Sequence, residues 1–283
     1  MNSKLVAVVK YSARMMLPAA WRRRAWDIIV GACFHRWALK AVIALAKARE
    51  EQQPKQLQRL ISMLESNNYR PAYESIQAEL GLDFKAFSCQ DVIAYIYFNG
   101  KPNGFFVDIG AFDGVEISNT YTLEGLGWEG ICIEPIPEVF SQLQLNRVCH
   151  KYNVAIANVS MDEAKFFKVS KLLGLSGLQQ QMPERIQKGL QKQGLEIEQT
   201  LVRTMTFDDV MKNHPTVSHI DFLSIDVEGG ELEVLQSIDF ERFRFGLITI
   251  ENNPGTGVLR DYMTKQGYAI FLDLGVDLMF VPV

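Results

Sequence analysis

Acidic side chains end two apolar, strand-like runs in the C-terminal half of the chain, where they could act on a bound ligand. Asp226 and Glu228 lie in the segment SIDVEGGE, and Glu251 ends the run LITIE. Carboxylates that lie close together raise one another's pKa, so one of them could be the general base for a hydroxyl group. The same three residues could instead hold a hard divalent cation that lowers the pKa of that hydroxyl. We expect Asp226, at the end of a buried strand, to be catalytic.

A structural role is the alternative for two acids of this segment. Glu228 and Glu231 lie at the start of a predicted helix, where negative charge stabilises the helix dipole and can cap the first turn. This interpretation suits Glu231 better than Glu228, and it leaves Asp226 unexplained.

A second chemical feature is the turn in FFVDIGAFDGVEISNT, residues 105–120. The apolar run ends at Asp108 and Ile109, Gly110 allows a close approach of backbone and ligand, and Gly114 can take a positive φ or pack tightly. Dinucleotide sites use G-x-G-x-x-G so that a helix N-terminus can hold a pyrophosphate. This turn lacks that spacing and any basic residue, and it carries two acids, Asp108 and Asp113. It therefore favours a cationic nucleoside without phosphate.

Glu134 ends the next apolar run, about 20 residues after the glycine turn, where nucleotide folds place an acid that binds ribose hydroxyls. S-adenosylmethionine has a ribose diol, a sulfonium and an amino group, so it matches both Glu134 and the acidic turn. The structural alternative is an acidic turn that only caps a helix.

Seven apolar runs of strand length alternate with helical segments such as 137–147 and 230–238. Continuous apolar strands joined by helical crossovers predict a mostly parallel sheet covered on both faces. The last two runs are joined by LGVD and predict an antiparallel hairpin at the C-terminus. The predicted strands are Phe105–Ile109, Gly130–Glu134, Asn153–Ala157, Phe222–Asp226, Leu247–Glu251, Ala269–Leu272 and Leu278–Val281.

Residues 1–80 are predicted to form helices. The start of this region is basic, because residues 1–49 hold ten Lys or Arg and one acid, whereas the whole chain has a net charge of −4. The amphipathic segment 26–48 could lie on an anionic membrane surface as a peripheral contact, or pack on the acidic body. No signal peptide or membrane span is predicted. Four scattered cysteines without a CxxC pair favour reduced thiols in the cytoplasm. The acidic body makes nucleic acid an unexpected partner.

Several motifs in order resemble the FkbM-type methyltransferases. They are FVDIGAFDG with SNTYTLEGLGWEGICIEPIPEVF after it, VAIAN, TFDDV, IDFLSIDVEGGELEVL and ITIENN, and the resemblance covers roughly residues 85–283. It implies a class I methyltransferase Rossmann-like fold, S-adenosylmethionine as cofactor, and O-methylation of a sugar, glycan or other natural product. By position, Asp108, Gly110, Gly114, Asn119 and Glu134 would contact the cofactor. The chain departs from the family at Phe112, where a smaller polar residue such as Asn is common.

The segment 159–204 is too long for a simple crossover in the expected domain 81–283. Long insertions in compact domains are often lids or binding loops, so it could cover the acceptor, or it could be a disordered surface loop. Two other functions remain open. One is a nucleotide-dependent oxidoreductase on the same fold, and the other is a non-catalytic module that recruits a partner through the basic N-terminal region.

Overall fold

The computed structural model describes residues 81–283, except 170–172, 180–186, 188–193, 253–256 and 275. The predicted N-terminal helices and their basic residues lie outside the described residues. Among those that are described, no helix is long and apolar enough to cross a membrane.

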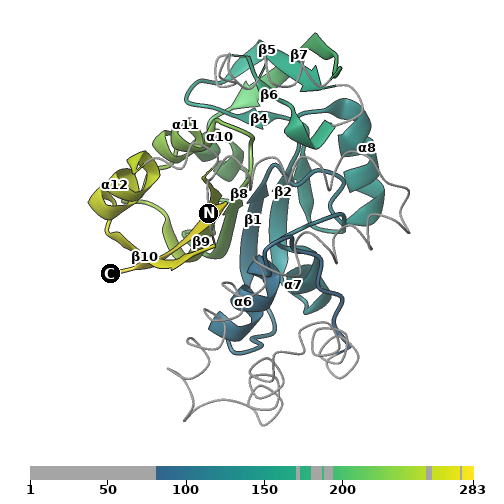
Figure 1. Ribbon diagram of the computed structural model, residues 1–283. Helices are drawn as coiled ribbons and strands as arrows, with labels where there is room; N and C mark the ends of the chain where they lie inside the picture. Colours follow the sequence, from purple (N-terminus) through teal and green to yellow (C-terminus); the bar gives the residue numbers. More distant parts are fainter. Residues whose placement is uncertain (1–80, 170–172, 180–186, 188–193, 253–256, 275) are drawn as a thin grey trace.

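A seven-stranded sheet forms the centre of the fold (Figure 1), in the order β10-β11-β9-β8-β1-β2-β3. Strands β3, β2, β1, β8 and β9 run parallel, whereas β11 is antiparallel to both β9 and β10. The predicted fold, a mostly parallel sheet with a C-terminal antiparallel hairpin, is confirmed. The strands are β1 (Phe105–Ile109), β2 (Glu129–Ile133), β3 (His150–Tyr152), β8 (His219–Ile225), β9 (Arg244–Glu251), β10 (Tyr268–Asp273) and β11 (Asp277–Pro282).

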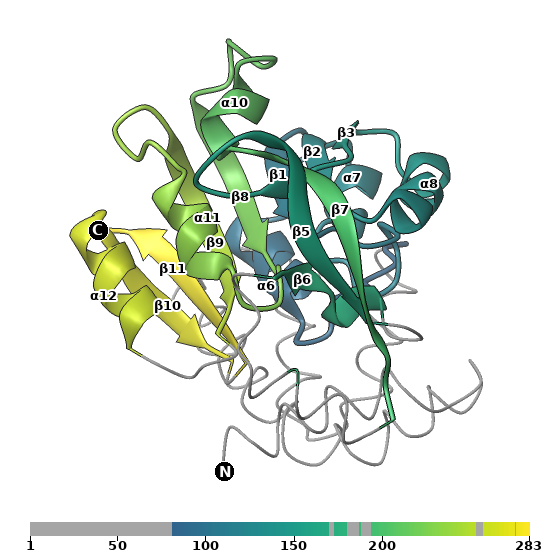
Figure 2. The same ribbon diagram turned by 90° about the horizontal axis from the view of Figure 1, so that it is seen from above.

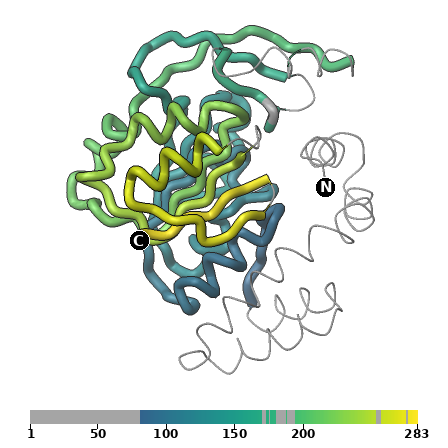
Figure 3. The backbone as a smooth tube through the Cα atoms, turned by 60° about the vertical axis from the view of Figure 1, so that its left-hand side comes forward, coloured from purple at the N-terminus to yellow at the C-terminus, as the bar shows by residue number. Residues whose placement is uncertain are grey.

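Helices cover both faces of this sheet, which explains why its strands are continuously apolar. Alternate residues of β1 serve the two faces: Phe106 packs with Ile93 of α6, while Val107 packs with Phe207 of α10. Figure 3 shows α6 beside the C-terminal hairpin. The rings of Tyr97 on α6 and Phe271 on β10 meet edge to face. The helices are α6 (Gln90–Tyr97), α7 (Tyr121–Gly125), α8 (Pro137–Asn146), α10 (Phe207–Met211), α11 (Glu231–Gln236) and α12 (Val258–Lys265), with a short 3-10 helix η2 (Leu173–Leu175).

One predicted strand belongs to a different sheet. The segment 153–157 was expected in the central sheet. Only Ala155–Ile156 of this segment form a strand, β4, and it pairs with β7 (Ile197–Met205) in a second sheet. The third parallel strand next to β2 is instead β3, whose three residues are polar or half-exposed. The prediction was wrong for two reasons. The edge strand β3 needs little apolar character, so it does not stand out in the sequence. The apolar strand β4 pairs with β7, about fifty residues further along the chain.

The second sheet has four strands in the order β4-β7-β5-β6, with β5 at Met161–Val169 and β6 at Gly177–Leu178. Figures 1 and 2 show that it crosses the carboxyl ends of the central parallel strands. Its inner side chains, including Phe166 and Val202, pack on Ile136 and Val139 at the start of α8. The described part of the insertion 159–204 is therefore a sheet with an apolar inner face, and the alternative of a disordered surface loop is wrong for that part.

Candidate functional site

Gly110 lies where the loops after β1 and β8 touch. Its φ is +88°, and a Cβ added there would lie 1.8 Å from the backbone oxygen of Asp226. The amide of Asp226 in turn donates a hydrogen bond to the carbonyl oxygen of Ile109 at 2.9 Å. Glycine is therefore required at position 110 by the neighbouring loop, which brings Asp226 against the glycine turn.

The amides of the glycine turn are used within the protein. The Asp113 carboxylate accepts hydrogen bonds from the amides of Val115 and Glu116 at 2.9 and 2.8 Å. The amide of Phe112 donates to Glu134 at 3.2 Å. Because phosphate sites need such amides pointing at the ligand, the turn suits a ligand without phosphate.

Glu134 follows β2 directly and is buried, with 5% of its surface exposed. One carboxylate oxygen accepts from the amide of Phe112, and the other accepts from the amide of Ile136 at 2.8 Å. Burial raises the pKa of Glu134 to about 7, against the effect of these two hydrogen bonds. Each oxygen keeps a second lone pair, so the carboxylate can still accept hydrogen bonds from two hydroxyl groups of a ligand.

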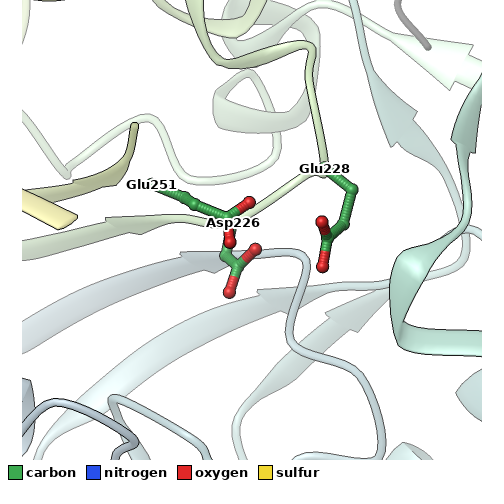
Figure 4. A group of neighbouring side chains, drawn as sticks. All are labelled: Asp226, Glu228 and Glu251. Atoms are coloured by element: carbon green, nitrogen blue, oxygen red, sulfur yellow. The ribbon is translucent and has the colours of Figure 1, made fainter. Parts of the chain in front are cut away.

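Asp226, Glu228 and Glu251 come together at the carboxyl ends of β8 and β9 (Figure 4), as predicted from the sequence. One carboxylate oxygen of each lies within 4.8 Å of the others, and Glu251 is buried while Asp226 and Glu228 are half-buried. Three carboxylate oxygens at this separation can surround one divalent cation or one cationic group of a substrate. The residues present therefore fit the predicted cation.

The loop that carries Glu228 has an unusual backbone. Glu228 has a φ of +60°, and Gly229 has a φ of +127°. Glu231, at the start of α11, accepts a hydrogen bond from the amide of Gly229 at 2.8 Å and is only 2% exposed. Burial raises the pKa of Glu231 to about 7. Its side chain thus shapes the loop, which agrees with the structural role predicted for it.

A cavity joins these features. Its non-atom space is about 610 Å³, part of it open to solvent, and Gly110, Glu134, Asp226 and Glu228 all line it. The segment that contains η2 and the second sheet supplies another wall, whose residues were not predicted from the sequence. That wall consists of Phe166, Leu173, Gly174, Ser176 and Leu178.

Three predicted cofactor contacts lie beside the cavity lining rather than in it. Asp108 is buried and accepts a hydrogen bond from Thr120, and Asn119 donates to Ser224. Gly114, with a φ of +81°, is packed so closely that an added Cβ would lie 2.6 Å from side-chain atoms of Leu143 and Arg147. Direct contact of these three residues with a cofactor stays a prediction.

Phe112 lines the cavity with a φ of +52°, in the left-handed region that Asn tolerates and Phe rarely adopts. Its side chain packs against the apolar cluster under the second sheet. The position is therefore one where the backbone favours the smaller polar residue, and the chain uses the aromatic ring as cavity wall instead.

The fold and the cavity define a Rossmann-like α/β protein with a cavity at the carboxyl edge of its sheet, where open α/β sheets bind ligands. The family model of the methyltransferase FkbM domain matches residues 108–270, which contain all the residues of the acidic cluster and the glycine turn. The chain belongs to the FkbM methyltransferase family.

A crystal structure of methyltransferase FkbM from Methylobacillus flagellatus KT is 14% identical to this chain, with a TM-score of 0.40. The similarity covers 90% of this chain and 60% of that one, so the chain spans less than two thirds of the solved protein. No curated protein matches the chain.

Proposed function

We propose that the protein is an S-adenosylmethionine-dependent methyltransferase that methylates a hydroxyl group of a sugar, glycan or other natural product. The observation that carries the proposal is that Gly110, Glu134, Asp226 and Glu228 line one and the same cavity in a chain of the FkbM methyltransferase family.

Different lining residues of this cavity suit different parts of the cofactor. The Glu134 carboxylate can accept both ribose hydroxyls, and apolar lining residues, among them Ile136 and Phe166, suit a base. Asp226 and Glu228, which also line the cavity, give a negative field that favours a sulfonium over a neutral sulfur. The amides of Phe112, Val115 and Glu116 already donate to carboxylates of the protein, so they are not available to bind a phosphate.

S-adenosylmethionine supplies a methyl group on a positively charged sulfur, and the acceptor oxygen forms the new bond to carbon as the carbon–sulfur bond breaks. The sulfur keeps the electron pair of that bond. The acceptor loses its hydroxyl proton, and we assign Asp226, which lines the cavity at the carboxyl end of β8, as the base that takes it. Holding the two reactants in line is expected to provide most of the acceleration.

A divalent cation held by Asp226, Glu228 and Glu251 is the second way to activate the acceptor, since a cation lowers the pKa of a bound hydroxyl. Treatment with EDTA followed by Mg²⁺ separates the two routes. Activity that disappears with the chelator and returns with Mg²⁺ supports the cation, whereas activity that EDTA leaves unchanged rejects it.

Titration calorimetry of the wild-type protein tests the cofactor. We expect S-adenosylhomocysteine, the reaction product, to bind and NADH to give no heat; the reverse result would indicate an oxidoreductase. Mass spectrometry of candidate glycans after incubation with labelled S-adenosylmethionine then tests the acceptor. Binding of the product without methylation of any acceptor in the panel would favour a non-catalytic module.

The affinity for S-adenosylhomocysteine should rise with pH up to about 7, because the raised pKa of Glu134 leaves it protonated at lower pH and the ionised form is the better acceptor for ribose hydroxyls. The expected change is up to about ten-fold per pH unit below that pKa. Glu134→Gln should bind more weakly and lose this dependence. The pKa of Glu231 is also raised to about 7, so Glu231 could cause a similar pH dependence. If Glu134→Gln kept the pH dependence of the wild type, Glu134 would not be its cause.

The same pKa has a consequence for stability without ligand. A carboxyl group whose pKa is raised on folding binds protons more tightly in the folded protein, so its contribution to stability is present below pH 4.5 and is lost as the pH rises through about 7. Urea unfolding of Glu134→Gln should therefore show a smaller loss of stability across this range than the wild type shows.

The second sheet should affect cofactor binding near Glu134, because Phe166 lines the cavity and packs with Ile136, two residues after Glu134. We expect Phe166→Leu to weaken S-adenosylhomocysteine binding about ten-fold through lost apolar contact. Leu201→Ala is the matched control, since Leu201 is 53% exposed and lies on β7 of the same sheet. Unchanged product affinity with a raised KM for the acceptor would assign the insertion to the acceptor instead.

A further inference from the structure

Arg147 is a buried cation outside the cavity. It follows α8 directly, and only 2% of the residue is exposed. Its Nε donates to Glu124 at 2.7 Å, its Nη1 donates to the carbonyl oxygen of Gly114 at 3.0 Å and to the Ser118 hydroxyl at 3.3 Å, and its Nη2 donates to the Thr120 hydroxyl at 3.1 Å. Three of these four acceptors belong to the segment that follows β1.

The hydrogen bonds continue from Arg147 across the sheet in a defined direction. Arginine can only donate, so the Thr120 oxygen accepts from it and the Thr120 hydroxyl proton goes to Asp108, at 2.6 Å. Asp108 is also hydrogen-bonded to Ser224 of β8, whose hydroxyl oxygen accepts from Asn119 at 3.0 Å. Asp108 and Asn119, both predicted as cofactor contacts, are thus linked to Arg147.

The segment 110–120 contains no helix or strand and depends on such contacts for its shape. Four of its residues have positive φ: Gly110, Phe112, Gly114 and Ile117. Left-handed backbone is unfavourable for Phe and Ile, so surrounding interactions must hold it in place. Two of these residues, Gly110 and Phe112, line the cavity, while the Arg147 contacts lie on the side of α7 and α8.

The charges favour this arrangement. Burial alone would raise the pKa of Glu124, but the Arg147 charge brings it below its usual value. Burial raises the pKa of Asp108, an effect that Thr120 and Arg147 reduce. One guanidinium therefore compensates two carboxylates, and its planar fork reaches acceptors in several directions at once, which a lysine ammonium cannot do.

We propose that Arg147 is a positioning residue that fixes the cofactor-binding shape of the 110–120 turn through Gly114, Ser118 and Thr120. The proposal rests on the proposed function. It implies that Asp108 serves this network and acts on the cofactor through the shape of the turn.

Arg147→Lys tests the proposal by calorimetry with S-adenosylhomocysteine. We expect its Kd to rise by at least about ten-fold, because small displacements of a binding element have large effects on alignment. Phe243→Leu is the control for general destabilisation, since Phe243 is fully buried in the cluster on the opposite face of the sheet. This variant should lower the Tm and keep the wild-type Kd.

A second pair of variants covers the case in which Arg147→Lys does not fold. Thr120→Val removes the hydroxyl that joins Arg147 to Asp108 and should raise the Kd, while Thr120→Ser keeps the hydroxyl and should restore binding. A wild-type Kd in folded Arg147→Lys, or equal Kd values for the two Thr120 variants, would overturn the positioning role alone. Absence of product binding by the wild type would overturn the proposed function and this role with it.

Discussion

Asp226→Asn should lower kcat for methyl transfer by about 10²–10⁴-fold, the range in which a positioned general base contributes. The substitution keeps the size of the side chain and removes its charge at the meeting point of the β8 and β9 loops. The measurement is transfer of labelled methyl to the acceptor found in the glycan screen. Glu241→Gln, an exposed acid after α11, should keep wild-type kcat and serves as the charge control.

Binding measurements on the same variant separate two roles of Asp226. The sulfonium of S-adenosylmethionine is attracted by the carboxylate, whereas the neutral sulfur of the product is not, so Asp226→Asn should weaken the former more than the latter. An unchanged kcat would remove Asp226 from catalysis. A kcat that recovers when Mg²⁺ is raised would make it a cation ligand.

Gly110→Ala should lower the free energy of unfolding by about 2–5 kcal/mol, the sum of the left-handed backbone penalty and overpacking. The added Cβ would lie 1.8 Å from the Asp226 carbonyl oxygen, so one loop must move. Because Asp226 sits on that loop, methyl transfer should fall as well. Urea unfolding and the labelled-methyl assay measure the two effects.

Gly267→Ala is the matched control for this prediction. Gly267 has a φ of +83°, close to that of Gly110, but an added Cβ meets no atom within 4 Å. It should therefore show only the backbone penalty of about 1–2 kcal/mol and keep full activity. Equal destabilisation by the two substitutions would mean that the contact between Gly110 and Asp226 does not constrain the site.

The acidic cluster could be predicted because the carboxyl ends of neighbouring parallel strands meet at one edge of the sheet. The apolar runs before Asp226 and Glu251 identified β8 and β9. Because these two strands pair in parallel, their carboxyl ends bring the acids together. The same reasoning placed Glu134 opposite the glycine turn. It could not separate residues that line the cavity from those that do not. Asp108 lies within β1 and is bonded to Thr120, whereas Gly110, two residues later, lies in the turn and lines the cavity.

Local pattern thus determined the central sheet except its edge strand β3, together with the C-terminal hairpin and the acids at the sheet edge, since burial on both faces imposes a continuous apolar sequence on each inner strand. Only the tertiary structure decided that β4 joins β7, that the inner face of the second sheet closes the cavity with Phe166, and that Arg147 supports the glycine turn. The contacts of Arg147 and the pairing of β4 with β7 join residues 23 to 49 positions apart. Nothing in the local periodicity of either partner specifies such a pairing, because it depends on how the finished layers pack.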